Sequence, residues 1–189
     1  SVVQVIGSCR REEVEPLRHR LSSSWSSEVN AFDAYIKEKS LHESSVTTGE
    51  PWVDRSAVWS LGLVAANAHQ IDGSLVPMPC PAEYNFFFTH DVLLTDLGAV
   101  NYDLPRVRRD LLYIASRAKN NVIPHAYYWK DDGFKTEFCT PDNWNHLWFI
   151  LVTASYLRHS FDDSTCAFLY PLVSKSLEEI LKQRKGDNL

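Results

Sequence analysis

The chain has 189 residues, of which 44% are hydrophobic and 23% are charged, and its formal net charge is -5. This length and composition suit a soluble globular chain with a substantial core. The acidic balance argues against nucleic acid or an anionic membrane surface as a partner, because both are bound through clustered lysine and arginine.

The four cysteines lie far apart and form no Cys-x-x-Cys pair. They predict neither a zinc site nor a disulfide framework, so we expect buried free thiols and no metal or cofactor. Unpaired cysteines favour the cytoplasm, although nothing in the sequence identifies the compartment. No apolar run reaches the roughly 18 residues of a membrane span, and the N-terminus lacks the basic segment of a signal peptide.

Apolar spacing is helical from the N-terminal region onward. Residues 10–40 predict a polar, amphipathic helix, or two helices broken at the serine cluster 22–27, and residues 56–70 predict a more apolar helix. The segment 72–88 that follows is long and contains proline, glycine and aromatic residues. Loops of this kind inside a compact helical domain are usually functional.

The next two predicted helices span 89–102 and 105–119. Thr89 stands where it would cap the first, and Asp103 precedes the second, which has Pro105 in its first turn. The apolar positions of the second helix recur at i, i+4, i+7 and i+11, as Val107, Leu111, Ile114 and Ala118.

Residues 120–141 form a second long linker, in which 122–129 is the best candidate for a strand. A helix over 142–159 follows the start signal "TPD". The last helix, 164–185, has an apolar stripe at Leu172, Leu177, Ile180 and Leu181. About six helices and little sheet predict an all-α fold. Helices rich in large apolar and aromatic residues alternate with helices that have a narrower stripe and more charge, which indicates helical hairpins with an inner and an outer layer.

The stretch "YNFFFTHD", residues 84–91, places four aromatic residues directly before a histidine and an aspartate. Asp91 falls in the first turn of a helix, where backbone N–H groups stabilise a carboxylate. Sugar sites combine such features, because rings stack on the C–H faces and carboxylates accept hydrogen bonds from hydroxyl groups. The alternative is that Phe86, Phe87 and Phe88 are core residues and Asp91 only stabilises the helix start.

The same arrangement recurs about 50 residues later, where an aromatic-rich loop again leads to an aspartate at the start of an apolar helix. We therefore expect both helix starts at the same end of neighbouring hairpins. Asn145, His146 and Trp148 lie in the second helix start. The predicted sugar-binding residues are Tyr84, His90, Asp91, His125, Trp129, Asp142, Asn143 and Trp144.

Two other interpretations remain open. His69 with the His90–Asp91 pair resembles the ligand set of HD-type metal phosphohydrolases, which are also all-α. The three phenylalanines before this pair, and the lack of a later aspartate that stands out as the closing ligand, argue against it. A non-enzymatic helical scaffold is the other interpretation. It predicts that the rings of Phe86 to Phe88 and Trp144 are buried, and that Asp91 and Asp142 only cap helices.

Three segments resemble the amylo-α-1,6-glucosidase (glycogen debranching) type of glycoside hydrolase and its glucoamylase-like relatives. They are "YNFFFTHDVLLTDLGAVNYD", "NNVIPHAYYW" and "TPDNWNHLWFILVTASYLRHSFDD". The resemblance covers about residues 50–185 and implies an (α/α)6 toroid that binds carbohydrate at α-glucosidic, α-1,6-like linkages. It implies that Asp91 binds the terminal glucose and that Asp142 joins the same subsite. His90 stands where the family usually has arginine.

A toroid of twelve helices needs on the order of 300 residues. We therefore expect a single helical domain over 1–189 that forms the N-terminal half of a toroid, with amphipathic helices in 1–50 and toroid hairpins in 51–189. The resemblance places the catalytic acid and base in later hairpins, with Asp142 as the candidate acid here, so whether the chain is an enzyme stays open. Uncovered helix faces predict a homo-oligomer or a missing C-terminal half of the toroid.

Overall fold

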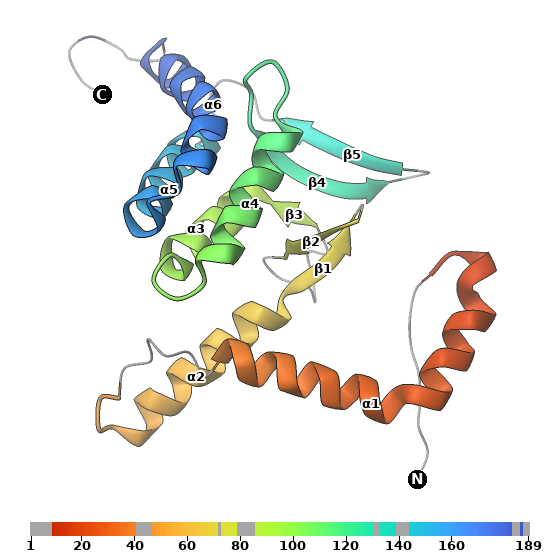
Figure 1. Cartoon of the computed structure of the whole chain (residues 1–189). Coiled ribbons are helices and arrows are strands. Elements are labelled where there is room, and N and C mark those ends of the chain that lie inside the picture. Colours follow the sequence, from red (N-terminus) through yellow and green to blue (C-terminus); the bar gives the residue numbers. More distant parts are fainter. Residues whose placement is uncertain are drawn as a thin grey trace. The chain divides into compact units, whose positions relative to one another are not determined.

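The computed structural model of the chain describes residues 9–40, 47–71, 73–78, 86–130, 133–138, 144–182 and 186. The chain divides into two compact units, Ser1–Ala66 and Asn67–Leu189. The described residues form six α-helices and five short strands, so the fold is mostly helical, as predicted (Figure 1).

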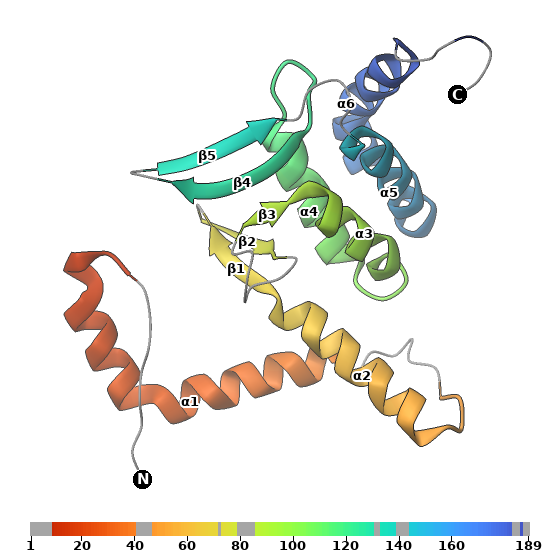
Figure 2. The same ribbon diagram turned by 180° about the vertical axis from the view of Figure 1, so that it is seen from behind.

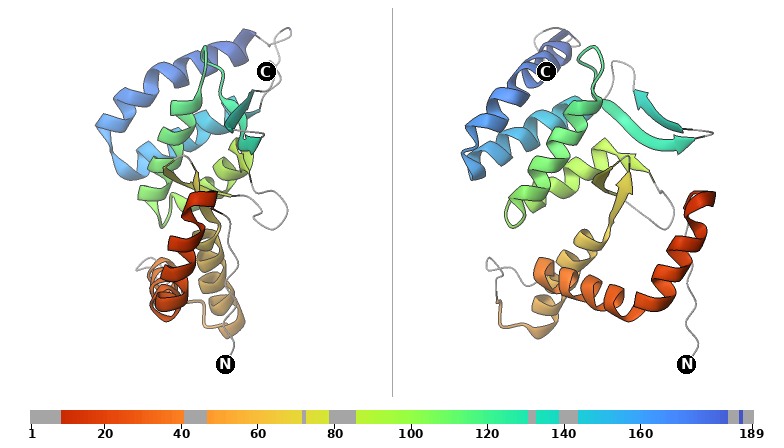
Figure 3. Two further views of the ribbon diagram at one scale, coloured as in Figure 1. Left: turned by 90° about the vertical axis from the view of Figure 1, so that its right-hand side faces the viewer. Right: turned by 45° about the vertical axis from the view of Figure 1, so that its right-hand side comes forward.

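The first unit consists of two helices, α1 (Val14–Ser40) and α2 (Pro51–Ala66), after a short 3-10 helix, η1 (Arg11–Glu13). Of the two alternatives for residues 10–40, a single helix is right. The hydroxyl groups of Ser22, Ser23 and Ser24 donate to carbonyl oxygens one turn earlier, so the serine cluster does not break the helix. Such bonds tend to bend a helix. Figures 1 and 3 show that α1 bends in its N-terminal half.

The second unit contains two helical hairpins. α3 (Thr89–Ala99) is followed by α4 (Leu104–Arg117), and α5 (Asn145–Ser160) by α6 (Asp163–Lys182). The predicted cap of α4 is confirmed, because Oδ1 of Asp103 accepts a hydrogen bond from the backbone N–H of Arg106 at 3.2 Å. The core between the helices contains fully buried apolar side chains, among them Leu93, Val107, Leu111, Ile114 and Phe149.

The apolar stripe of α6 is only partly inside this core. Leu169 and Ser176 are buried, whereas Leu177 and Leu181 are each 47% exposed. The predicted helix is present, but Leu177 and Leu181 of its apolar stripe lie outside the core. Both leucines project from the hairpin toward solvent.

Five strands complete the second unit. β1 (Ala68–Ile71) and β2 (Ser74–Pro77) form a hairpin, and β3 (Phe87–Phe88), β4 (Pro124–Lys130) and β5 (Gly133–Phe138) form an antiparallel sheet in that order. The strand predicted at 122–129 is confirmed by β4, and the other four were not predicted. Figure 2 shows β3 leading into α3 beside β4 and β5. The sheet thus holds the N-terminus of α3 against β4, which lies about 40 residues later in the sequence.

The free cysteines depart from the prediction. Cys9 is exposed and Cys166 is half-buried, so the expectation of buried thiols is wrong for Cys9, while Cys80 and Cys139 lie outside the described residues. Within the described part of the chain, no helix combines the length and apolar character needed to cross a membrane.

Candidate functional site at the helix starts

The first residues of α3 and α5 are bound to one backbone oxygen. The hydroxyl of Thr89 donates to the carbonyl oxygen of Pro124 at 2.6 Å, and the amide of Asn145 donates to the same oxygen at 3.1 Å. Both side chains are buried. One carbonyl of β4 therefore holds two helix N-termini close together, which confirms that the two helix starts lie at the same end of neighbouring hairpins.

Thr89 does not cap α3, and that prediction is wrong. The residue at the N-cap position is Phe88, which makes no capping hydrogen bond with its side chain, and Thr89 is already the first helical residue. Its hydroxyl is committed to Pro124, 35 positions away in the sequence. The role of Thr89 is to join α3 to β4.

A group of aromatic rings lies at these helix starts. The imidazole of His90 stacks on the indole of Trp148, with ring centroids 5.8 Å apart and an interplanar angle of 21°. The ring of Trp144 lies 6.5 Å from that of His90 and is tilted by 32°. Because Trp144 is 69% exposed, this group presents an aromatic surface to solvent.

The three phenylalanines before α3 divide between core and surface. Phe87 is fully buried and packs edge-on against Tyr113, with ring centroids 5.1 Å apart. Phe86 and Phe88 are half-buried, and Phe88 contacts the ring of His125 edge-on at 5.6 Å. Alternation along β3 accounts for this division, because successive side chains of a strand point to opposite faces. The scaffold interpretation required all three rings and Trp144 to be buried, and that requirement is not met.

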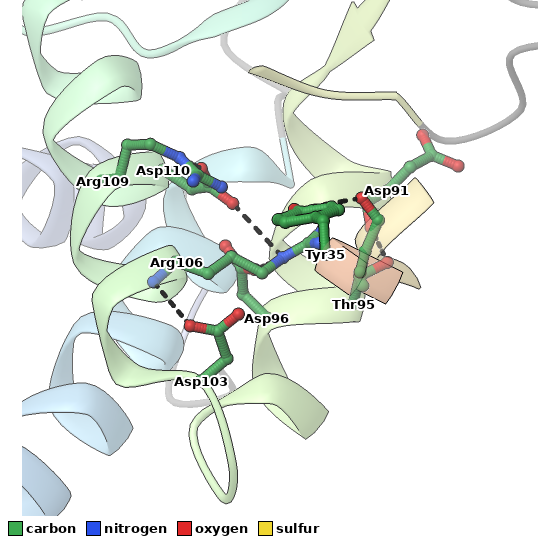
Figure 4. A network of polar contacts seen from close by, with 9 residues as sticks. Tyr35, Asp91, Thr95, Asp96, Asp103, Arg106, Arg109 and Asp110 are labelled. Atoms are coloured by element: carbon green, nitrogen blue, oxygen red, sulfur yellow. Dashed lines mark hydrogen bonds and ion pairs between the residues drawn. The ribbon is translucent and has the colours of Figure 1, made fainter. Parts of the chain in front are cut away.

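Asp91 lies in the first turn of α3 with an exposed side chain. Its carboxylate makes no hydrogen bond or ion pair with any described residue. Figure 4 shows it directed away from the charged side chains of α4. The positive end of the helix dipole stabilises a carboxylate at this position. Asp91 is thus placed to accept hydrogen bonds from a ligand.

The other predicted site residues are described less completely. His125 is half-buried in β4, next to Pro124, and the backbone of Trp129 pairs with Phe134 in the same sheet. Tyr84, Asp142 and Asn143 lie outside the described residues. The structure therefore brings together His90, Trp144 and Trp148, with Asp91 next to His90 in the sequence and His125 against Phe88.

His146 faces the interior instead of the site. Its Nδ1 lies 2.9 Å from the hydroxyl oxygen of Ser176, and both side chains are buried. Burial lowers the pKa of the His146 imidazole, so the neutral ring is favoured. His146 thus links α5 to α6.

A charged cluster is buried between α3 and α4 (Figure 4). The Nε of Arg106 lies 3.3 Å from Asp96 and 3.6 Å from Asp110, and the Nε of Arg109 lies 3.1 Å from Asp110. Burial raises the pKa of Asp110 to about 6 and raises that of Asp96 well above its usual range. Both carboxyl groups are shielded from solvent, so they stabilise the hairpin and do not reach a ligand.

The described part of the chain holds no group of three or more His, Cys, Asp or Glu side chains arranged to bind a metal. His69 lies in β1, where its backbone partner is Val76. The HD-type interpretation therefore finds no ligand set among these residues.

We use the term helix-start site for His90, Asp91, His125, Trp144 and Trp148. Its rings can stack on a flat, weakly polar face, and its carboxylate can accept hydrogen bonds from hydroxyl groups. Sequence reasoning identified these residue types, but not the roles of Thr89 and Pro124 in holding them. No protein-family model matches the chain, and no curated protein matches it.

Proposed function

We propose that the chain recognises carbohydrate at the helix-start site, as part of a glycoside hydrolase that acts on α-glucosidic, α-1,6-like linkages. The main support is the stacking of His90 on Trp148 beside the exposed ring of Trp144. A pyranose ring has C–H faces that suit such a surface. The carboxylate of Asp91, which makes no hydrogen bond or ion pair with any described residue, supplies the acceptor for sugar hydroxyl groups.

The proposal includes an (α/α)6 toroid as the complete architecture. The hairpins α3–α4 and α5–α6 support it, because α3 and α5, the first helices of the two hairpins, pack on each other and both start at the site. This chain would supply about half of the toroid. Further hairpins, in the same protein or in a partner, would cover the helix faces of the second unit that remain exposed.

Catalysis requires a carboxylic acid and a base on either side of the glycosidic bond. Asp91 has the exposure that such a role demands, whereas Asp96 and Asp110 are buried against arginine. In our proposal the described residues bind and orient the sugar, and the catalytic pair is supplied by the further hairpins. Hydrolysis is then a property of the completed toroid.

A titration with isomaltose and maltooligosaccharides, followed by tryptophan fluorescence, tests the proposal. We expect a saturable change at millimolar sugar, and at least a tenfold weaker affinity for Trp144→Ala and Asp91→Asn. Trp52→Ala is the matched control, because Trp52 of α2 is 70% exposed and Trp144 is 69% exposed. An unchanged affinity in Trp144→Ala and Asp91→Asn, or no response to any of the sugars, would contradict the proposal.

A further inference from the structure

An apolar groove lies between α1 and α2 in the first unit. It has a volume of about 320 Å³, and its walls include Phe32 and Ile36 from α1 and Val58, Trp59 and Leu63 from α2. The two helices approach closely at Gly62, where an added Cβ would lie only 3.3 Å from Cγ2 of Ile36. The close approach leaves the larger side chains on the rims of the groove.

The apolar surface continues along α1 beyond the groove. Trp25, Val29 and Phe32 are exposed, and with Ile36 they recur at i, i+4, i+7 and i+11, so they lie on one face of the helix. Trp59 and Leu63 on α2 are exposed as well. Scattered single apolar residues are normal on a surface, but a contiguous face of this kind marks an interaction site.

The first unit has almost no core of its own. Among its described residues only Ser40, Gly62 and Ala65 are buried, and none of these has a large side chain. Two helices that bury so little apolar surface are marginal in water, since helices in proteins are stabilised mainly by packing of their apolar faces. We use the term α1–α2 face for the apolar surface formed by Trp25, Val29, Phe32 and Ile36 of α1 and by Trp59 and Leu63 of α2. This face therefore requires another element to pack against it.

We propose that a second copy of the chain covers this face and that two α1–α2 pairs form a four-helix bundle around a twofold axis. An isologous dimer requires a self-complementary surface. The α1–α2 face meets this requirement, because it offers both a protruding apolar stripe on α1 and a groove that accepts one.

The charges at the edge of the face support a second copy as the occupant. Arg55 lines the groove and makes no ion pair with any described residue. If the two α1 helices cross antiparallel at Phe32, Ile36 lies opposite Glu28 of the second copy, and Arg55 lines the same groove as Ile36. Within its own copy Glu28 lies 3.8 Å from Arg20, and this exposed ion pair contributes little to stability. Arg55 and Glu28 can thus pair across the interface.

Sedimentation of the full chain over a range of concentrations tests the dimer. We expect a monomer–dimer equilibrium, and a dissociation constant at least tenfold higher for Phe32→Glu and for Arg55→Glu. Glu28→Arg combined with Arg55→Glu should recover much of the loss. Circular dichroism checks that each variant keeps its helices.

Phe168→Glu is the matched control, because Phe168 is a similarly exposed phenylalanine on α6 of the second unit, at 61% against 56% for Phe32, and this variant should still dimerise. A wild-type chain that stays monomeric at every concentration would overturn the proposal, since another part of the chain or another protein would then cover the face. A dimer that Phe168→Glu disrupts and Phe32→Glu does not would overturn it as well. Neither result depends on sugar binding.

Discussion

Thr89 and Asn145 donate hydrogen bonds to the same atom, the backbone oxygen of Pro124. Each is the first residue of its helix, and Pro124 is the first residue of β4. This shared acceptor fixes the spacing of the two helix N-termini. The exposed rings and the carboxylate of the helix-start site belong to residues at or next to these N-termini. Buried hydrogen bonds of this kind determine the positions of the two helices more strictly than apolar packing does, because a bond that is not made leaves a buried polar group without a partner.

Thr89→Val should destabilise the second unit by about 1–2 kcal/mol, because it removes a buried hydroxyl donor and keeps the side-chain shape. Adding Asn145→Ala should cost more than the sum of the two single changes, since the Pro124 oxygen then loses both donors. Urea denaturation measures both effects. Thr95→Val is the control, because the exposed hydroxyl of Thr95 donates to the backbone carbonyl oxygen of Asp91, and this variant should stay within about 0.5 kcal/mol of wild type. Equal losses at Thr89 and Thr95 would contradict this role.

The buried acid pair between α3 and α4 predicts a pH dependence of stability. Burial places the pKa of Asp110 at about 6 and raises that of Asp96, both above their unfolded values. The folded state therefore binds protons more tightly, and the stability that the pair contributes is lost as the pH rises from about 4 through 6. Asp110→Asn should flatten this decline, as measured by urea denaturation at several pH values. Asp163→Asn, at an exposed position, should show the same change of stability with pH as the wild type. If Asp110→Asn also shows the wild-type change, the buried acid pair does not cause the pH dependence.

Ser176→Ala should destabilise the α5–α6 hairpin by about 1–3 kcal/mol, because the buried Nδ1 of His146 loses its partner. The pKa of His146 is lowered by burial, so its contribution is present above the unfolded value near 6.5 and is lost as the pH falls below it. Denaturation at about pH 7.5 isolates the hydrogen bond from this titration. Ser174→Ala, at a half-buried position of the same helix, should change stability by less than about 0.5 kcal/mol. A similar loss in both variants would point to a general helix effect.

Phe161→Gly should stabilise the second unit by roughly 0.5–1 kcal/mol. Phe161 follows α5 with φ 53° and ψ 33°, a left-handed conformation that glycine adopts without steric cost. Its side chain is 84% exposed, so little packing is lost. Phe161→Ala keeps the unfavourable backbone and should bring no gain in melting temperature. A gain of equal size in both variants would show that the backbone is not the cause.

Local interactions explain which features the sequence predicts well. Asp103 caps a helix three residues away, and a bond of that range is visible as a pattern of neighbouring residue types. Thr89 has the same pattern, but its hydroxyl bonds to Pro124 because the β3–β4 pairing brings the two together. That pairing depends on a strand of two residues, Phe87 and Phe88, which is too short to show a periodicity.

The burial of single side chains is less visible in the sequence. The spacing of Leu177 and Leu181 matches a core-facing helix stripe, yet both are exposed because no described element packs over that face. The aromatic run before α3 predicted either a core or a binding surface, and the strand alternation gives both, with Phe87 inside and Phe86 and Phe88 toward the surface. Sequence spacing specifies which residues share a face of a helix or strand. Whether another element packs on that face depends on the tertiary arrangement.

Nuclear magnetic resonance mapping of the full chain during an isomaltose titration tests sugar recognition at the helix-start site most directly. Binding there should shift the backbone amide signals of residues 88–91, 125 and 144–148 in a saturable manner and leave those of α1 and α2 unchanged. Asp91→Asn should reduce the shifts at the same sugar concentration. The absence of shifts at millimolar isomaltose, or shifts confined to residues outside these segments, would contradict the proposed site.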